Sequence, residues 1–267
     1  MSAPVDKAES KEPLRLERLR DGRVLSIVID RPKANIIDTA VMNALRAAIR
    51  SAAAAPELKL VVLHGAGGNF SFGASVEEHK KDKAAGMLAA FHATTRELAA
   101  LPIPLAALVE GKCLGGGFEI ALMGHYLFAT EGAAFGCPEI KLGVFPPVLA
   151  AIGALRLGAP LTERLVTTGA TIGTEVMLQA GALTAVVGTP ALDGVLAWYD
   201  ANLAPLSAAA LRIATRASRM GSGMLTSLDG TLASLEALYV KDVLASQDGN
   251  EGIEAFLARR PPAWKDA

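Results

Sequence analysis

Apolar residues along the chain fall into two kinds of segment. Short runs rich in β-branched residues predict buried strands, over residues 23–30, 58–67, 103–111, 125–130, 133–136 and 183–188. The longer segments between them have apolar residues at helical spacing and predict helices. Because strands alternate with helices over most of the chain, the pattern predicts an α/β fold.

Local signals set the ends of the predicted helices. Asp38 is a typical N-cap for a helix over 39–55. Ser75, followed three residues later by Glu78, fits a capping box and predicts a helix that starts there and runs toward Leu101. After residue 205 the pattern predicts only helices, so a helical C-terminal region follows the α/β core.

Composition limits the class of protein. The chain has 267 residues, 26 Lys and Arg against 27 Asp and Glu, and a formal net charge of −1, with no basic block of the kind that binds nucleic acid. Its longest apolar stretch, 144–155, has two prolines and is too short to span a bilayer. The polar lead-in, 1–13, lacks the apolar region of a secretory signal. We therefore expect a cytoplasmic protein without nucleic-acid or membrane partners.

The stretch CLGGGFEIAL, residues 113–122, places three glycines between a predicted strand and a predicted helix. Glycines allow a ligand to approach the backbone closely, and the N–H groups at a helix start attract negative charge. Glu119 then falls in the first turn of this helix, inside an apolar run. A buried carboxylate is costly unless its pKa rises or it finds partners. A tight packing turn explains the triplet alone equally well.

Two further stretches combine a turn with polar groups. FSFGASVEEH, residues 70–79, places the amide of Ala74 near a predicted helix start, although an ordinary capped helix explains this stretch by itself. In FGCPEIKLGVFPP, residues 135–147, Glu139 follows a rigid proline turn with apolar neighbours. For an isolated Glu, a solvated surface turn is the commoner case.

Other chemistries lack their motifs. The four histidines have no paired spacing, so we expect no metal site. The chain has no P-loop, no dinucleotide fingerprint and no G-x-S-x-G elbow. Its two cysteines, Cys113 and Cys137, are too few for a disulfide framework.

Taken in this order and spacing, the three stretches resemble the crotonase (enoyl-CoA hydratase/isomerase) family. The resemblance extends from RPKAN at residues 31–35 to EGIEAFLARRPPAW at 251–264. It implies a spiral of β-β-α turns over 14–200 and a C-terminal helical oligomerisation region over 201–267. It also implies a homo-trimer or hexamer that binds acyl-CoA and needs no cofactor beyond the CoA of its substrate.

Positions can be carried over from the family one by one. The resemblance implies oxyanion-hole N–H groups and catalytic carboxylates at Ala74, Gly116, Glu119 and Glu139. It implies CoA contacts at Lys33, Ala34, Ser75 and Val76. It implies an acyl pocket formed by Leu114, Leu142, Phe145 and Pro147. Arg259 and Arg260 are candidates for the CoA phosphates, although a solvated terminal pair is the simpler interpretation.

The sequence also departs from the common hydratase pattern. Ser75 replaces a frequent Asp, Glu77 replaces a frequent Lys, and VFPPVLA at 144–150 replaces a glycine-rich loop beside Glu139. In KANIID, FSFGASVEEH and EIKLGVF the chain is similar to one branch, the cyclohexa-1,5-diene-1-carbonyl-CoA hydratases of anaerobic aromatic degradation. That branch implies a 1,4-addition of water, which yields 6-hydroxycyclohex-1-ene-1-carbonyl-CoA.

Three alternatives stay open at this point. The first is a general hydratase or isomerase of linear 2-enoyl-CoA. Two glutamates favour the hydratase, since many isomerases of the family keep one. The second is a non-catalytic acyl-CoA- or RNA-binding member, which the near-neutral charge and the two glutamates disfavour. The third is a serine hydrolase on the same fold, which lacks a convincing Ser/His/Asp set here.

Overall fold

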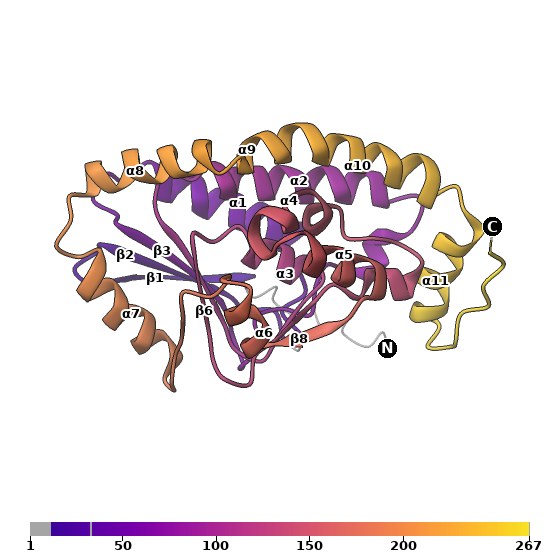
Figure 1. Cartoon of the computed structure of the whole chain (residues 1–267), viewed down its shortest axis with the longest axis horizontal. Coiled ribbons are helices and arrows are strands. Elements are labelled where there is room, and N and C mark those ends of the chain that lie inside the picture. The colour runs from indigo at the N-terminus through magenta and orange to yellow at the C-terminus, as the bar shows by residue number, and fades with distance from the viewer. Residues whose placement is uncertain (1–11, 33, 267) are drawn as a thin grey trace, which may run out of the picture.

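The main sheet has six strands, and those labelled in Figure 1 lie left of the centre of the picture. The computed structural model describes residues 12–32 and 34–266. In spatial order, the strands are β1 (Leu14–Leu19), β2 (Val24–Ile29), β3 (Leu60–Gly65), β4 (Leu105–Val109), β6 (Tyr126–Ala129) and β9 (Ala185–Val186). β1 pairs antiparallel with β2, and every other neighbouring pair is parallel.

Three short strands form a second sheet, and two of them directly follow strands of the main sheet in the sequence. The order of the second sheet is β5 (Lys112–Leu114), β7 (Ala134–Gly136) and β8 (Thr171–Gly173). β4 and β5 are separated by only two residues, so the chain passes directly from one sheet to the other just before the glycine triplet. This step repeats in β6 and β7, as expected for a spiral of β-β-α turns.

The apolar pattern explains which strands are central. β2 is buried along its whole length, because helices cover both faces of the parallel sheet. Leu25, Ile27 and Ile29 face the larger core cluster, and Val24 faces a smaller cluster against α7 (Ala191–Asn202). β1 lies at the edge, where a charged face meets solvent.

Helices cover the sheets and form the upper layer in Figure 1. The α-helices of the core are α1 (Thr39–Ala53), α2 (Ala84–Ala100), α3 (Gly116–Ala121), α4 (Pro147–Leu157), α5 (Ala159–Thr168) and α6 (Thr174–Gln179). Two 3₁₀ turns, η1 (Val76–His79) and η2 (Pro138–Leu142), precede α2 and α4. The Asp38 side chain accepts a hydrogen bond from the Val41 N–H at 2.9 Å, which confirms the predicted cap of α1.

The C-terminal region is helical in the residues that the structure describes, as the sequence predicts. α8 (Ala208–Gly221), α9 (Met224–Thr226) and α10 (Leu232–Leu238) run in one line above α1 and α2 in Figure 1. Two π-helical segments, η3 (Ser227–Thr231) and η4 (Tyr239–Val243), continue this line, and α11 (Gln247–Leu257) lies beside the C-terminus.

The structure corrects the sequence interpretation in two places. Ser75 forms no side-chain cap and is followed by the 3₁₀ turn η1, so the predicted capping box is wrong and the long helix α2 begins only at Ala84. The Glu78 carboxylate instead accepts from the Thr39 hydroxyl at 3.0 Å, at the start of α1. The edge strand β1 and the short strands β5 and β8 also carried too little β-branched signal to be predicted.

No helix among the described residues has both the length and the apolar character that a membrane crossing requires.

Candidate active site

The glycine triplet turns the chain from β5 into α3. Gly115 has φ +51°, and a Cβ built on it would lie 2.7 Å from the Glu139 Oε1. A Cβ on Gly116 would lie 3.0 Å from the Phe91 ring and 3.3 Å from the Ala74 Cβ. Side chains at these positions would therefore fill the space beside Glu139 and Ala74, and glycine leaves that space open.

A second turn brings Ala74 against Gly116. The Ser71 hydroxyl donates to the Asn35 carbonyl at 2.7 Å and accepts from the Gly73 N–H at 3.0 Å. The Ile37 N–H then donates to the Gly73 carbonyl at 2.9 Å. Neither the Ala74 N–H nor the Gly116 N–H donates to another group in the described part of the chain. Two neighbouring backbone donors are thus left for another acceptor.

Glu119 lies in the first turn of α3, where the sequence placed it, and is 3% exposed. Its Oε1 accepts from the Leu149 N–H at 2.8 Å, in the first turn of α4. Burial raises the pKa of this carboxyl, and the N–H groups of Leu149 and Val148 partly oppose that rise. The α4 N-terminus therefore favours the ionised form of Glu119 within an apolar setting.

Glu139 is held by η2 on the opposite side of the glycine turn. The residue is partly exposed, but its Oε2 is buried and has no hydrogen-bond partner within the described ranges. Burial raises the pKa of this carboxyl, and the negative charge of Glu119 raises it further. With no donor at Oε2, the protonated form of Glu139 is favoured over the ionised form.

Both carboxyl groups face one small cavity. Its other lining residues are Ala74, His79, Met87, Leu88, Phe91, Gly116, Phe145, Pro146, Pro147 and Tyr239. Its volume is about 20 Å³, enough for about one water molecule. The structure therefore brings together Ala74, Gly116, Glu119 and Glu139, and it adds Phe145 and Pro147 of the predicted acyl pocket.

Sequence reasoning missed two polar side chains of this cavity. The His79 Nδ1 lies 2.8 Å from the Ser75 carbonyl, to which it donates as Nδ1–H, so Nε2 of the neutral ring is an acceptor. Burial lowers the pKa of His79, which keeps the ring neutral. Tyr239 is 1% exposed, and its hydroxyl has no partner among the described residues. Its ring packs against Phe145 with centroids 5.4 Å apart.

No local signal marks Tyr239 as a site residue. It belongs to η4, far along the chain from both glutamates, and only the fold brings it to them. Burial raises the pKa of its hydroxyl, and the charges of Glu139 and Glu119 raise it further. The cavity thus combines residues of the core with one residue of the C-terminal region.

Other predicted site residues lie outside the cavity lining. Among the described residues, neither Leu114 nor Leu142 lines the cavity. Leu114 ends strand β5, and Leu142 ends η2, where its backbone lies against Gly252 of α11. Ala34 and Ser75 belong to the hydrogen-bonded turn that holds Ala74, and Val76 packs against the core beside it. Lys33 lies outside the described residues.

The two C-terminal arginines lie at the surface. Arg260 is exposed and donates to the Glu251 carboxylate at 2.8 Å, and Arg259 is exposed as well. Over residues 12–32 and 34–266, no three His, Cys, Asp or Glu side chains gather in a way that could hold a metal ion.

Comparison with known proteins matches this geometry to a family. The enoyl-CoA hydratase/isomerase family profile matches residues 20–267. The chain belongs to the enoyl-CoA hydratase/isomerase family. A cyclohexa-1,5-dienecarbonyl-CoA hydratase of Thauera aromatica is 39% identical over 259 residues, which cover 97% of this chain and 99% of that protein. A carnitinyl-CoA dehydratase of Salmonella enteritidis is 33% identical, over 94% of this chain and 98% of the relative.

Solved structures of the family share the fold. An enoyl-CoA hydratase of Mycobacterium avium subsp. paratuberculosis superposes with a TM-score of 0.80 at 30% identity, covering 95% of this chain and 99% of that one. An enoyl-CoA hydratase/isomerase of Xanthobacter autotrophicus gives the same TM-score at 25% identity, over 93% and 97%. The crotonase-type fold expected from the sequence is confirmed.

Proposed function

We propose that the protein is a hydro-lyase that adds water to an unsaturated acyl-CoA thioester. The observation that carries this proposal is one cavity lined by Glu119, which is buried, and by Glu139, whose Oε2 is buried. The same cavity is lined by Ala74 and Gly116, whose backbone N–H groups have no acceptor in the described chain. Hydration of a conjugated thioester needs both kinds of group, because negative charge develops on the carbonyl oxygen while protons move at the carbon chain.

The N–H groups of Ala74 and Gly116 act on the carbonyl oxygen. When water attacks the carbon β to the thioester, electron density moves to this oxygen. Two preorganised donors stabilise that charge, and one such donor contributes about 3–4 kcal/mol in comparable enzymes. The glycines at 115 and 116 keep the approach to these donors free of side chains.

The two carboxyl groups divide the proton transfers. Glu119, whose ionised form is favoured by the N–H groups of α4, removes a proton from the attacking water. Glu139, whose buried Oε2 has no donor in the described chain, carries a proton and delivers it to carbon. Because the pair is coupled, the pH dependence of turnover reports the two groups together.

We further propose that the substrate is cyclohexa-1,5-diene-1-carbonyl-CoA. The hydroxyl group adds to the carbon β to the thioester and the proton adds to the far end of the diene, which yields 6-hydroxycyclohex-1-ene-1-carbonyl-CoA. The 39% identity to the Thauera hydratase supports this substrate. The rings of Phe91, Phe145 and Tyr239 supply apolar, planar surfaces that suit a flat ring.

Binding of this ring requires the cavity to open. A volume of about 20 Å³ holds no six-membered ring, so lining side chains must move when substrate binds. Phe145 and Tyr239 are the proposed gate, because they close the cavity from a loop and from a π-helical segment and pack on each other.

The remaining parts of the proposal concern the assembly and the CoA group. CoA contacts are assigned to the loop at Lys33 and Ala34 and to Ser75 and Val76, and CoA arrives with the substrate rather than as a bound cofactor. The C-terminal region forms a homo-trimer or hexamer, which is supported by Ile213 and Met220 of α8, 69% and 72% exposed. We place the enzyme in the cytoplasm.

The test is a steady-state assay of purified protein with cyclohexa-1,5-diene-1-carbonyl-CoA and with crotonyl-CoA, with mass and hydroxyl position determined for each product. We expect rapid hydration of the diene and little turnover of crotonyl-CoA. Preference for crotonyl-CoA would replace the cyclic substrate by a linear one and leave the hydratase chemistry in place. No turnover of either would refute the hydratase assignment.

A further inference from the structure

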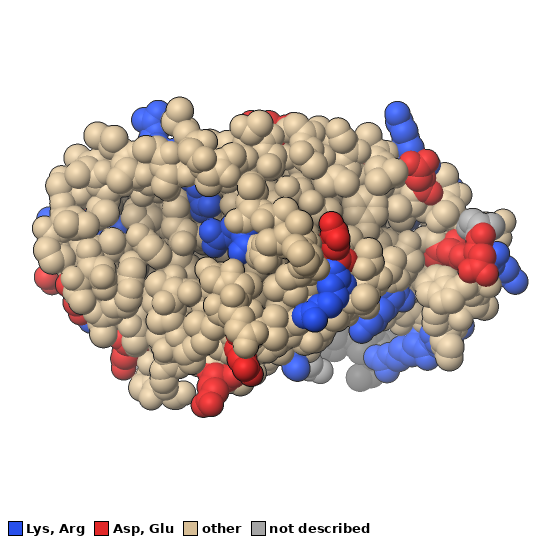
Figure 2. Space-filling view, viewed as in Figure 1, with Lys and Arg blue, Asp and Glu red and all other residues tan. Residues whose placement is uncertain are grey.

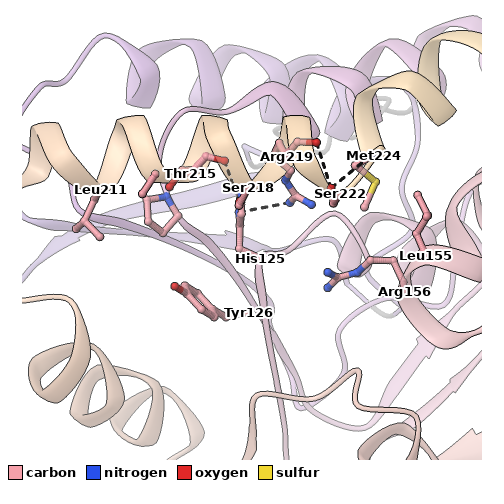
Figure 3. Close-up of a pocket in the computed structure, with 12 residues that line it drawn as sticks. His125, Tyr126, Leu155, Arg156, Leu211, Thr215, Ser218, Arg219, Ser222 and Met224 are labelled. Atoms are coloured by element: carbon pink, nitrogen blue, oxygen red, sulfur yellow. Dashed lines mark hydrogen bonds between the residues drawn. The ribbon is translucent and has the colours of Figure 1, made fainter.

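A second pocket lies between α4, α8 and the start of β6, and it shares no lining residue with the glutamate cavity. Its volume is about 390 Å³, within the usual range of roughly 300–1,000 Å³ for small-molecule sites. Figure 2 shows Lys and Arg atoms near the middle of a face that is otherwise mostly uncharged. In Figure 3, Arg219 from α8 and Arg156 from α4 extend toward this pocket beside His125.

Neither arginine has a counter-charge among the residues that the structure describes. Arg219 is 5% exposed, and neither it nor Arg156 forms an ion pair with a residue in the described ranges. Burial lowers the pKa of Arg219 to about 10, and the nearby charge of Arg156 contributes to this shift. Two like charges in a partly desolvated pocket are unfavourable unless an anion joins them.

Part of each arginine has a structural role. Arg219 Nη2 donates to the Met123 carbonyl, and Arg156 Nη2 donates to the Gly124 carbonyl at 2.8 Å. These carbonyls follow α3, where positive charge is favourable. This role accounts for one nitrogen of each guanidinium. The buried Nε of each has no acceptor among the described residues.

His125 adds a third unpaired donor. Its Nδ1 accepts from the Leu105 N–H at 3.1 Å, so the proton of the neutral ring is on Nε2. Burial, followed by the charges of Arg219 and Arg156, lowers the pKa of His125 to about 3 and keeps the ring neutral. The Nε2 is buried without a partner in the described chain. The polar groups of this cluster that lack partners are therefore all donors.

We propose that this pocket binds a small anion, a carboxylate or phosphate group carried on a compact apolar body, which accepts hydrogen bonds from Arg156, Arg219 and His125. The hydroxyl groups of Ser218 and Ser222 lie on the same side of the pocket. Tyr126, Leu155, Leu211 and Met224 give the remainder an apolar wall for the body of the ligand. The site is independent of the proposed hydration chemistry.

The test is isothermal titration calorimetry on the full chain in its native assembly, in low-salt buffer, with benzoate and inorganic phosphate as separate probes. We expect saturable binding of at least one probe, at one site per chain. Benzoate binding identifies a carboxylate with an apolar body as the ligand class, and binding of phosphate alone identifies a phosphate group.

Variants of the same helix assign the binding to the pocket. Arg219→Met should weaken binding at least tenfold, whereas Arg216→Met, which removes an exposed arginine of α8, should leave it unchanged. Ala214→Trp fills the pocket while keeping all three donors, and it should also abolish binding. This variant keeps the test valid if Arg219→Met does not fold.

Two outcomes would overturn the proposal. One is the absence of binding by the unmodified protein for both probes at millimolar concentration. The other is equal weakening by Arg219→Met and Arg216→Met, which would indicate a general charge effect. If the unmodified protein binds neither probe and Arg219→Met dissociates the assembly, the cations face a carboxylate of a neighbouring subunit instead.

Discussion

Glu119 and Glu139 are the same residue type in one cavity, yet their surroundings differ. Glu119 accepts a backbone hydrogen bond from the start of α4, while Glu139 has a buried oxygen without a partner in the described chain. Burial raises the pKa of both carboxyls, and the charge of Glu119 raises the pKa of Glu139 further. This difference in donors, rather than any difference in the side chains, supports the assignment of base and acid.

Replacing Glu139 with Gln should lower turnover by about 10²- to 10⁴-fold, the usual contribution of a general acid. The same change should stabilise the fold at pH 8. A carboxyl whose pKa is raised in the folded state loses its stabilising effect on the fold as the pH rises through that pKa. At pH 8 the fold must therefore bury part of the Glu139 charge, whereas Gln has no charge to bury. Turnover of the diene and urea unfolding at pH 8 measure the two effects.

Glu163→Gln is the matched control, because Glu163 is an exposed carboxylate on α5. It should change neither turnover nor stability appreciably. Near-normal turnover in Glu139→Gln would remove Glu139 from the mechanism, whereas a loss of both activity and stability would indicate a structural role.

At the scale of single elements, the short helix α3 determines the site. Its first residue supplies a proposed oxyanion donor, its first turn supplies Glu119, and the carbonyls that follow it contact Arg156 and Arg219. The N-terminus of α4 meets it at Leu149. One end of this helix pair therefore faces the glutamate cavity, and the other end faces the proposed anion pocket.

Gly116→Ala tests the close approach at the start of α3. The new Cβ would lie 3.0 Å from the Phe91 ring and 3.3 Å from the Ala74 Cβ, so both neighbours must shift. We expect kcat/KM to fall by about 10²- to 10³-fold, as for loss of one oxyanion donor. Gly86→Ala on α2 meets no atom within 4 Å and should keep full activity while adding about 0.5–1 kcal/mol of stability. Equal activity in both variants would contradict the assigned donor.

The sequence predicted the larger strands and helices and the residue types of the site, but not which distant residues would line the cavity. The β-branched runs became β2, β3 and β4, and Asp38 caps α1 as expected. The capping box at Ser75 failed because Glu78 bonds to Thr39, a residue distant in sequence that local pattern reasoning does not consider. Tyr239 was also missed because its contact is with residues distant in sequence: only packing of the C-terminal region brings it to the glutamates.

At the scale of the whole molecule, burial sets the charge state of the histidines. The chain has four histidines, and burial lowers the pKa of all of them. A histidine that stays neutral in the folded state stabilises the fold above its unfolded pKa. That stabilisation is lost as the pH falls and the unfolded chain takes up protons that the folded chain excludes.

His64 allows this effect to be measured, because burial lowers its pKa from 6.5 to about 4. Between pH 7 and pH 4, the free energy of unfolding of the unmodified protein should fall relative to that of His64→Gln by up to about 3 kcal/mol. Ser26→Ala removes the partner 2.9 Å from His64 Nε2 but keeps the imidazole, so it should follow the unmodified protein. Parallel curves for the unmodified protein and His64→Gln in urea unfolding would contradict a buried neutral His64.

The sequence by itself determined the buried parallel strands of the main sheet, the glycine triplet before α3, and which family the ordered motifs resemble. These features depend on local periodicity and on residue types at fixed spacing, which a single chain displays directly. The tertiary structure alone decided which polar groups are buried without partners, that Tyr239 and His79 join the two glutamates, and that Arg156 and Arg219 meet beside His125. These features depend on desolvation and on contacts between distant segments, and both arise only when the chain packs.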